Sequence, residues 1–288
     1  MIDLHMHSNF SDGTDDLKTL IENVIKHKIK TFALTDHDTA EGCRQIYTNQ
    51  SLQTLLNQNG VEFISGAEWT CILDKQKMHI LAYGFDPFDE NIVYLENEMR
   101  KMLNCKDEYR MVKLNEMGYE FSQKSLQYLA EKENIRTLDF AKCLVDDGYF
   151  DNVHVAIQDC IDLIKIPFQC KFNTIEAIKI LKKAGAVVIW AHPIYDIRRD
   201  VVSFEKVEDL IELLKPVGLD GIECFYSLYS KEEIDKLVAI AKKHKLLISC
   251  GSDYHGENKD VKLGSFSSDN IKVDEKGVIE CKKIIMGE

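Results

Sequence analysis

Seven short runs rich in β-forming residues recur along the chain, and segments with helical periodicity lie between several of them. The runs are residues 2–6, 31–35, 61–68, 78–85, 186–193, 221–225 and 246–253. In the segment 15–28 the apolar residues recur at the spacing of one helix face, and 173–185 and 231–245 also have helical patterns. Alternating strands and helices predict an α/β fold, and seven strands favour a closed parallel barrel over an open sheet.

The middle of the chain has a different character. From about residue 91 to residue 171 it is rich in Glu, Lys and Met, and it has helical patterns with almost no strand-like runs. We interpret this segment as a helical insertion between the fourth and fifth strands. The predicted division is a barrel formed by 1–95 and 172–288, with a helical subdomain at 96–171 that caps the active site.

Composition limits the partners of such a protein. The 288 residues have a net charge of −12, which argues against a broad basic surface for long nucleic acid. The nine cysteines stand singly without a CxxC pair, so buried free thiols in a reducing cytosol are favoured over a disulfide framework. The first residues lack signal-peptide features, and no run of about 20 apolar residues occurs. We therefore expect a cytoplasmic protein without a membrane partner.

Histidines and acidic residues gather at the ends of the predicted strands. His5 and His7 are two residues apart on the first strand, so their side chains share one face. Either histidine alone could equally be an ordinary core or surface residue. The ends of later strands repeat the pattern with His37, Glu68, His192, Asp253 and His255, whereas His79 opens the fourth strand. Because the carboxyl ends of parallel barrel strands meet at one mouth, these side chains are expected to share one site.

The mixture of imidazoles and carboxylates indicates metal binding. Nitrogen and oxygen donors together suit manganese, iron or zinc better than calcium or magnesium, which prefer all-oxygen sites. Six histidines and three acidic residues exceed what a single ion can hold. The sequence therefore predicts two to three divalent metal ions, with manganese as the first choice and iron or zinc as alternatives.

The segments that carry these residues also form a recognisable ordered set. They are DLHMHSNFSDGT, FALTDHDTAEG, ISGAEWT, HILAYGFD, AVVIWAHP, DGIECFYS and CGSDYHG. Together they resemble the PHP (polymerase and histidinol phosphatase) superfamily of metal-dependent phosphoesterases. The Ser-Asp-Gly after the paired histidines and the helical insertion look most like the stand-alone branch. That branch includes nucleoside 3′,5′-bisphosphate phosphatases and enzymes that trim short RNA from its 5′ end, and histidinol phosphatases form the neighbouring branch.

The resemblance implies a distorted seven-stranded (β/α) TIM-like barrel with a trinuclear metal site. One ion would be held by His5, His7, Glu68 and Asp253, a second by Glu68, His79 and His192, and a third by Asp12, His37 and His255. In such a site a metal-bound hydroxide would attack a phosphate monoester or diester, without a covalent enzyme intermediate. In agreement, the sequence has neither a P-loop pattern nor a nucleophile elbow.

Two aspartates beside His37 have alternative interpretations. Asp36 is expected to orient an imidazole from outside the set of metal ligands. Asp38 or Thr39 is expected to cap the helix that starts near Ala40. Direct metal ligation by either aspartate is the alternative.

Substrate contacts are harder to assign from the sequence. Arg136 could bind the second phosphate of a bisphosphate through a bidentate contact, or it could be a solvated arginine at a helix start. Lys165 and Lys171 are weaker candidates for the same phosphate. The aromatic residues Tyr226, Tyr229 and Trp69 could stack on a base or pack in the core. Three further histidines are interpreted as surface or structural residues: His27, His154 and His244.

Three functions compete with hydrolysis of a small nucleotide. Histidinol-phosphate hydrolysis is the alternative within the same superfamily. An amidohydrolase-type C–N hydrolase also opens with His-x-His on the first strand of a barrel, but Asp12, the Asp-His-Asp segment and the final Asp-x-His favour a third ion and hence a phosphoesterase. A catalytically silent PHP binding module is disfavoured because the residues at all nine ligand positions are present.

Overall fold

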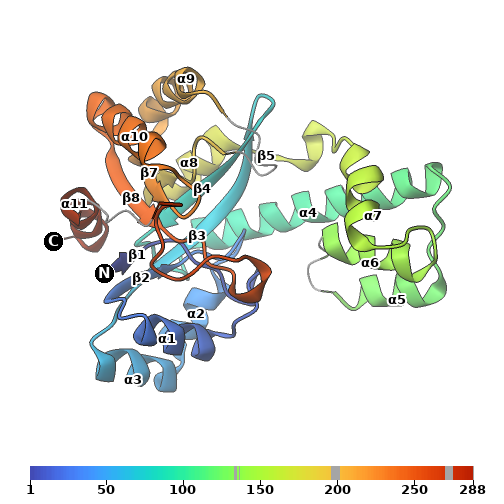
Figure 1. The fold of residues 1–288 in the computed structure, drawn as a ribbon, viewed down its shortest axis with the longest axis horizontal. Coiled ribbons are helices and arrows are strands. Elements are labelled where there is room, and N and C mark those ends of the chain that lie inside the picture. Colours follow the sequence, from blue (N-terminus) through green and yellow to red (C-terminus); the bar gives the residue numbers. More distant parts are fainter. Residues whose placement is uncertain (133–134, 136, 196–201, 270–274, 288) are drawn as a thin grey trace. The chain divides into compact units, whose positions relative to one another are not determined.

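The structure is a computed structural model that describes residues 1–132, 135, 137–195, 202–269 and 275–287. The chain divides into two compact units. The first is formed by Met1–Asn97 together with Asn173–Glu288, and the second by Glu98–Phe172. Figure 1 shows the strands gathered in the first unit and a group of helices in the second.

The strands of the first unit form a barrel. In hydrogen-bonded order they are β1 (Ile2–Asp3), β2 (Thr31–Leu34), β3 (Glu62–Leu73), β4 (Gln76–Tyr83), β6 (Val187–Trp190), β7 (Gly221–Tyr226) and β8 (Leu247–Gly251), and the short β5 (Phe172–Asn173) lies off this path. The N–H of Leu4 donates to the carbonyl of Cys250 (3.0 Å), which joins the first strand to the last. The predicted seven-stranded barrel is therefore confirmed.

The barrel is not parallel throughout, which corrects the sequence-based expectation. Strand β4 runs antiparallel to both β3 and β6, whereas the other neighbouring pairs in the barrel are parallel. Only Asp74 and Lys75 separate β3 from β4, and so short a connection makes a hairpin because a parallel crossover needs a dozen or more residues. The beginning of β4 therefore lies at the same edge as the carboxyl ends of the parallel strands.

Helices surround the strands of the first unit (Figure 1). They are α1 (Leu17–Lys26), α2 (Glu41–Thr48), α3 (Gln50–Asn59), α8 (Thr174–Lys183), α9 (Phe204–Leu214), α10 (Lys231–His244) and α11 (Glu275–Met286), with the short turns η3 (Lys215–Val217) and η4 (Gly256–Asn258). Helix α1 starts where the Asp16 side chain accepts the N–H of Thr19, and its apolar face packs with Phe32 and Leu34 of β2. The helical periodicity in the sequence thus reflects packing onto the barrel.

The second unit is helical, as the sequence predicts for this region. Helix α4 (Glu90–Glu116) leads into it, followed by α5 (Gln123–Ala130), α6 (Thr137–Asp146), α7 (Val153–Asp159) and the turns η1 (Ile161–Leu163) and η2 (Phe168–Cys170). Its core includes Leu114, Phe140 and Leu144. Capping of the active site by this unit stays a prediction.

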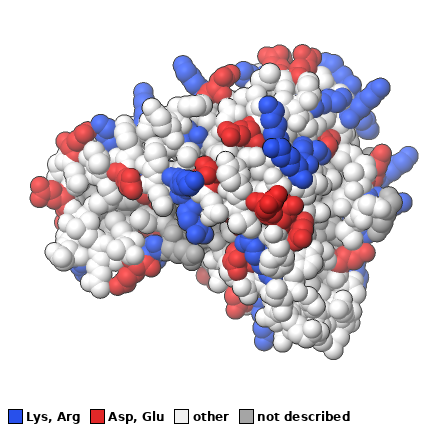
Figure 2. Space-filling view, turned by 180° about the vertical axis from the view of Figure 1, so that it is seen from behind, with Lys and Arg blue, Asp and Glu red and all other residues white. Residues whose placement is uncertain are grey.

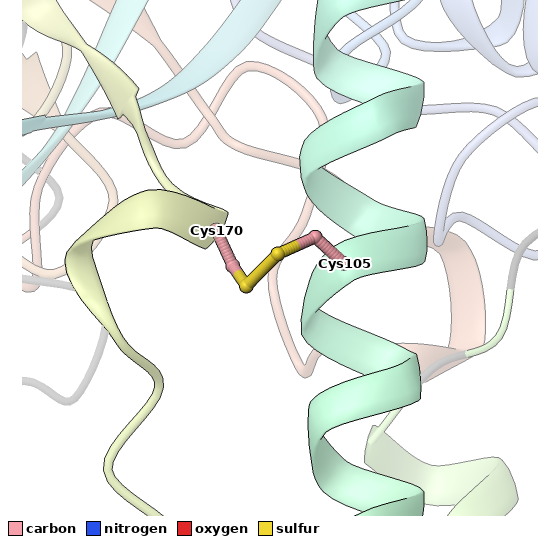
Figure 3. The surroundings of a disulfide bond; sticks show 2 residues. All are labelled: Cys105 and Cys170. Atoms are coloured by element: carbon pink, nitrogen blue, oxygen red, sulfur yellow. A yellow bond between two sulfur atoms is a disulfide. The ribbon is translucent and has the colours of Figure 1, made fainter.

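A disulfide joins Cys105 of α4 to Cys170 of η2 (Figure 3). Its two residues are 65 positions apart, so it links the two ends of the helical unit. The other seven cysteines are buried free thiols. The expectation of free cysteines thus holds for these seven and is wrong for this pair, because two isolated cysteines gave no spacing signal that they would meet.

The surface carries charges of both signs. Figure 2 shows acidic and basic side chains interspersed on the face in view. Within the described part of the chain, no helix has the length and apolar character needed to cross a membrane.

Candidate metal centre

The first and last sequence motifs lie side by side where the barrel closes. The N–H of His7 donates to the Tyr254 carbonyl (2.8 Å), and the N–H of Asp253 donates to the His5 carbonyl (2.8 Å). Met6 is fully buried in the core, so His5 and His7 share the opposite face, as the two-residue period of a strand predicts. Both imidazoles thereby approach the carboxylate of Asp253, with Nε2 of His7 3.2 Å from its Oδ1.

His37 and Glu68 meet where the pairing with β3 continues beyond the end of β2. The N–H of Asp38 donates to the Glu68 carbonyl (2.8 Å), and the N–H of Glu68 donates to the Asp36 carbonyl (3.1 Å). These backbone bonds place Nδ1 of His37 3.2 Å from Oε2 of Glu68. Two motifs about 30 residues apart in sequence thus form one corner of the site.

The reversed direction of β4 explains the unusual position of His79. Its Nδ1 lies 2.8 Å from Oε1 of Glu68. The N–H of Ala191 donates to the His79 carbonyl (3.0 Å), and the adjacent His192 places its Nε2 3.1 Å from the same Glu68 oxygen. A histidine that opens an antiparallel strand therefore reaches the edge at which parallel strands end.

Glu68 lies at the centre of the cluster. Its Oε2 is 3.1, 3.2 and 3.2 Å from ring nitrogens of His5, His7 and His37, while its Oε1 faces the other two imidazoles. The side chain is 1% exposed. A buried carboxylate that faces imidazoles with both oxygens has the arrangement needed for a ligand shared between two ions.

The candidate ligand atoms form three overlapping groups, and within each group they all lie within 4.8 Å of one another. The groups are His5, His7, Glu68 and Asp253; His7, Asp12, His37 and His255; and His37, Glu68 and His79. The first is the set expected for one ion, and the second adds His7 to the set expected for another. The third group differs from the set expected for the remaining ion, because it contains His37 in place of His192. His192 is nevertheless close, with its Nε2 3.3 Å from Nδ1 of His79. The structure thus brings all nine predicted residues together.

Two histidines use one ring nitrogen, Nδ1, in a hydrogen bond to a backbone carbonyl, which leaves Nε2 facing the cluster. Nδ1 of His192 donates to the Tyr195 carbonyl (3.1 Å), and Nδ1 of His255 donates to the Asp253 carbonyl (2.8 Å), since a carbonyl can only accept. In a neutral imidazole the inner Nε2 then carries a lone pair, and that of His255 faces Oδ1 of Asp12 at 3.1 Å. Two facing acceptors require a proton or a cation between them, and the arrangement matches that of histidine ligands in metal sites.

Several inner nitrogens have no hydrogen-bond partner among the described residues. Nε2 of His7, Nδ1 of His37 and Nε2 of His255 are buried and unpaired, although carboxylate oxygens lie near each of them. Buried polar atoms without a partner are costly in an ordinary protein interior. Metal ions would satisfy them, so the donor set fits the metal centre predicted from the sequence.

The charges of the cluster favour the same conclusion. Burial raises the pKa of Glu68, but the positive charges of His79 and His5 bring that pKa well below its usual range. Burial likewise opposes ionisation of Asp253, yet His5 and Lys259 lower its pKa. Both carboxylates are therefore ionised when the imidazoles beside them are protonated. Imidazoles that bind a metal must be neutral, so the buried carboxylates would then need another source of positive charge. Divalent cations would provide that charge.

Glu223 of β7 is a site residue that the sequence analysis missed. It is fully buried, its Oε1 lies 3.0 Å from Nδ1 of His5, and its Oε2 accepts the backbone N–H of His192 (2.9 Å). One carboxylate outside the set of candidate ligands thus orients two of them, His5 and His192. A signal existed in the sequence, because Glu223 is the one acidic residue in the strand-like run GIECF at 221–225.

The two aspartates beside His37 organise the backbone around the site. Asp36 accepts the N–H (2.8 Å) and hydroxyl (2.7 Å) of Ser8 and the hydroxyl of Ser11 (2.7 Å), so it orders the turn before Asp12. Asp38 accepts the N–H of Thr70 (2.7 Å). Among the described residues, the hydrogen bonds of Asp36 are to Ser8 and Ser11 and not to an imidazole, so the predicted orientation of an imidazole is not observed.

The predicted cap of helix α2 is wrong for Asp38. Ala40 occupies the N-cap position, and its N–H donates to Oε1 of Glu96 in α4 (2.6 Å). Thr39 contributes in part, because its hydroxyl accepts the N–H of Glu41 (3.1 Å). A distant glutamate replaces the local cap, which the sequence could not indicate.

The structure tests some of the residues that were predicted to contact the substrate and not others. Tyr226 is buried, and its hydroxyl donates to Oδ2 of Asp253 (3.0 Å). Trp69 and Tyr229 are fully buried, so their packing role is confirmed and stacking on a base is wrong for this structure. Arg136 lies outside the described residues. Lys165 and Lys171 belong to the helical unit, and their contact with a substrate stays a prediction.

The three remaining histidines are surface or structural residues, as predicted. His27 and His154 are exposed. His244 pairs with Glu208 (3.1 Å). None of the three contributes to the groups described above.

Comparison with known proteins gives a consistent result. A family model described as the PHP domain matches residues 3–164. A phosphoribosyl 1,2-cyclic phosphate 1,2-diphosphodiesterase from Eggerthella lenta is 23% identical, over 88% of this chain and 94% of its own length. A 3′,5′-nucleoside bisphosphate phosphatase from Chromobacterium violaceum is 26% identical, over 88% and 87%, and a 5′-3′ exoribonuclease from Haemophilus influenzae is 27% identical, over 88% and 89%.

A solved structure from Bifidobacterium adolescentis, described as a metal-dependent phosphoesterase, has the same fold. It superposes with a TM-score of 0.72 at 28% identity, covering 93% of each chain.

Proposed function

This chain belongs to the PHP domain family and is a metal-dependent hydrolase of phosphoester bonds, and from that premise we propose that its substrate is a small nucleotide. The proposed substrate is a nucleoside 3′,5′-bisphosphate or the 5′ end of a short RNA. The observation that carries the proposal is the largely buried cluster of nine imidazole and carboxylate side chains with Glu68 at its centre. Two of the relatives act, by name, on these two classes of substrate.

We propose that two to three divalent ions, manganese in the first place and iron or zinc as alternatives, bind in this cluster. The residues that would hold them are His5, His7, Asp12, His37, Glu68, His79, His192, Asp253 and His255. Bound there, such ions would polarise a phosphoryl group and would supply a nucleophile at neutral pH. The protein positions the donors, because Glu223 and two backbone carbonyls hold the outer nitrogens of His5, His192 and His255.

The exposed side of the cluster is where a phosphate would enter. The side chains of His5, His7 and Glu68 are at most 1% exposed, whereas those of His37 and Asp12 are 23% and 41% exposed. Asp12 follows the turn that Asp36 orders through Ser11. We therefore expect the phosphoryl group to approach from the side of Asp12 and His37.

A cyclic phosphodiester is a second candidate substrate. The relative from Eggerthella lenta, named for a phosphoribosyl 1,2-cyclic phosphate, aligns over 94% of its own length. A diester of this kind requires the same metal chemistry but two successive hydrolysis steps to release phosphate. Histidinol phosphate is the remaining phosphoester alternative. A C–N hydrolase and a silent binding module receive no support from the named activities of the relatives.

A substrate panel tests the proposal directly. Metal-loaded protein is incubated with a nucleoside 3′,5′-bisphosphate, a short 5′-phosphorylated RNA, a phosphoribosyl 1,2-cyclic phosphate and histidinol phosphate, and released phosphate and products are measured. We expect the highest kcat/KM with the bisphosphate or the RNA. The His37→Ala variant should lose turnover, which excludes a contaminating phosphatase. Preference for the cyclic phosphate or for histidinol phosphate would overturn the substrate assignment, and turnover by His37→Ala would overturn the site.

A further inference from the structure

The two carboxylate oxygens of Asp253 face different surroundings. Oδ1 lies 3.4 Å from Nε2 of His5 and 3.2 Å from Nε2 of His7, inside the candidate metal cluster. Oδ2 accepts the hydroxyl of Tyr226 (3.0 Å) and also contacts Nζ of Lys259 (2.6 Å). Asp253 therefore links the cluster to a lysine that the sequence analysis did not select.

Lys259 approaches the cluster from a loop that is fixed in place. It follows η4, where the Asn258 side chain donates to the backbone carbonyl of Asp12 (2.6 Å) and the N–H of Glu257 donates to the Thr14 hydroxyl (2.9 Å). The loop after β8 is thereby tied to the turn that carries Asp12, which is the exposed side of the cluster. The Lys259 side chain is 34% exposed, while that of Asp253 is 4% exposed. Its ammonium group thus lies between the buried carboxylate and solvent.

The two partners of Asp253 Oδ2 are suited to different tasks. Tyr226 is buried, and its single O–H donates to this oxygen. Lys259 has three N–H donors, so two remain after the contact with Asp253. If the ammonium group turns toward an incoming anion, Tyr226 still satisfies Oδ2. Movement of Lys259 therefore leaves no buried acceptor unpaired.

We propose that Lys259 binds a phosphoryl oxygen of the substrate and that Tyr226 is the positioning residue for Asp253. This inference rests on the proposed phosphoesterase function. A phosphoryl group that reaches the cluster beside Asp253 comes within reach of an ammonium group that is 2.6 Å from the same carboxylate. A charge-assisted hydrogen bond from a lysine to a phosphate is stronger than one between neutral groups.

The test separates phosphate binding from metal binding. Binding of inorganic phosphate to manganese-loaded protein and binding of Mn²⁺ to metal-free protein are each measured by calorimetry, neither of which requires turnover. We expect Lys259→Ala to weaken phosphate binding about 10- to 100-fold and to raise KM more than it lowers kcat. Lys259→Arg should restore most of the affinity. Lys262→Ala, an exposed lysine on the same loop, is the matched control and should bind phosphate like the wild type.

Tyr226→Phe should have the opposite profile. Loss of its hydrogen bond to Asp253 should weaken Mn²⁺ binding about 10-fold or more, as for other groups that orient metal ligands, and Lys259→Ala should change it far less. The proposal is overturned if Lys259→Ala binds phosphate normally, or if it loses Mn²⁺ as strongly as Tyr226→Phe does. Both titrations are independent of turnover. If the protein hydrolyses none of the tested nucleotides, the proposed function is refuted, but the phosphate and Mn²⁺ titrations still test the roles of Lys259 and Tyr226.

Discussion

Glu223 illustrates how much one side chain outside the ligand set contributes to the site. Its two oxygens contact the ring of His5 and the backbone of His192, which follow different strands of the barrel, β1 and β6. The backbone of Gly251 lies close to both Glu223 and His5. A Cβ added to Gly251 would lie 2.0 Å from the Cβ of His5 and 2.8 Å from Oε1 of Glu223, so a larger residue would not fit there. The absence of a side chain at Gly251 thus allows His5 and Glu223 to meet.

The Glu223→Gln variant is expected to weaken metal binding. Glutamine keeps the shape of the side chain but removes the charge that holds Nδ1 of His5 as a donor, so metal affinity should fall about 10- to 100-fold. The measurement is calorimetric titration of metal-free protein with Mn²⁺. Glu280→Gln, an exposed position on α11, serves as the control. Unchanged Mn²⁺ affinity in Glu223→Gln would show that Glu223 does not orient the ligand.

At the scale of the elements, two connections decide how the chain is organised. The two-residue turn between β3 and β4 reverses one strand and brings His79 to Glu68. The disulfide between α4 and η2 closes the helical unit (Figure 3). Neither connection has a strong local sequence pattern, yet each determines which residues meet.

The disulfide can be tested by counting thiols. Unfolded, unreduced protein should expose seven titratable thiols, and reduction should raise the number to nine. The Cys105→Ser/Cys170→Ser double variant should be less stable by about 2–4 kcal/mol, because the unfolded chain loses a long covalent loop. A reducing agent should destabilise the wild type by a similar amount and leave the double variant unaffected. Nine thiols in unreduced protein would contradict the bond.

Asp107 of α4 should give the helical unit a pH-dependent stability. Burial raises the pKa of its carboxyl group from 3.8 to about 6, Lys106 and Arg110 lower it in part, and Asp139 raises it. Between these two values the folded state holds a proton that the unfolded state has released. The free energy of unfolding should therefore decrease as the pH rises through this interval, by at most about 3 kcal/mol from this group.

The Asp107→Asn variant isolates this contribution. Urea unfolding of the wild type and of the variant is compared at several values between about pH 4 and pH 7. The difference in unfolding free energy between the two proteins should change across the interval and level off above it, because the asparagine does not titrate. Parallel pH profiles for the two proteins would mean that Asp107 titrates normally in the folded state.

At the scale of the whole molecule, the candidate metal ligands all belong to the barrel unit. Ions that bind the folded barrel and not the unfolded chain should stabilise it, by about 2.7 kcal/mol when the free ion is at 100 times its dissociation constant. Protein purified without a chelator should contain two to three manganese, iron or zinc ions per chain by elemental analysis.

Hydrogen exchange locates the effect of metal removal. Chelation should increase exchange in β3, β4 and the segments around His5 and Asp253, while the core of the helical unit around Phe140 should change little. The helical unit acts as an internal control. Equal deprotection of both units, or none in the barrel, would contradict metal binding by the barrel residues.

The sequence by itself determined where most strands and helices lie and which side chains share one face of them. Periods of two and of about 3.6 residues are local properties of strands and helices, so the face shared by His5 and His7, most strand positions and the helical middle segment could be predicted. The ordered motifs also identified nine residues that the fold brings together. Only the tertiary structure decided the direction of β4, the sharing of Glu68 among five imidazoles, the roles of Glu223 and Lys259, and the pairing of Cys105 with Cys170. These depend on which distant segments become neighbours, and closure of the barrel fixes that through hydrogen bonds between residues up to about 250 positions apart.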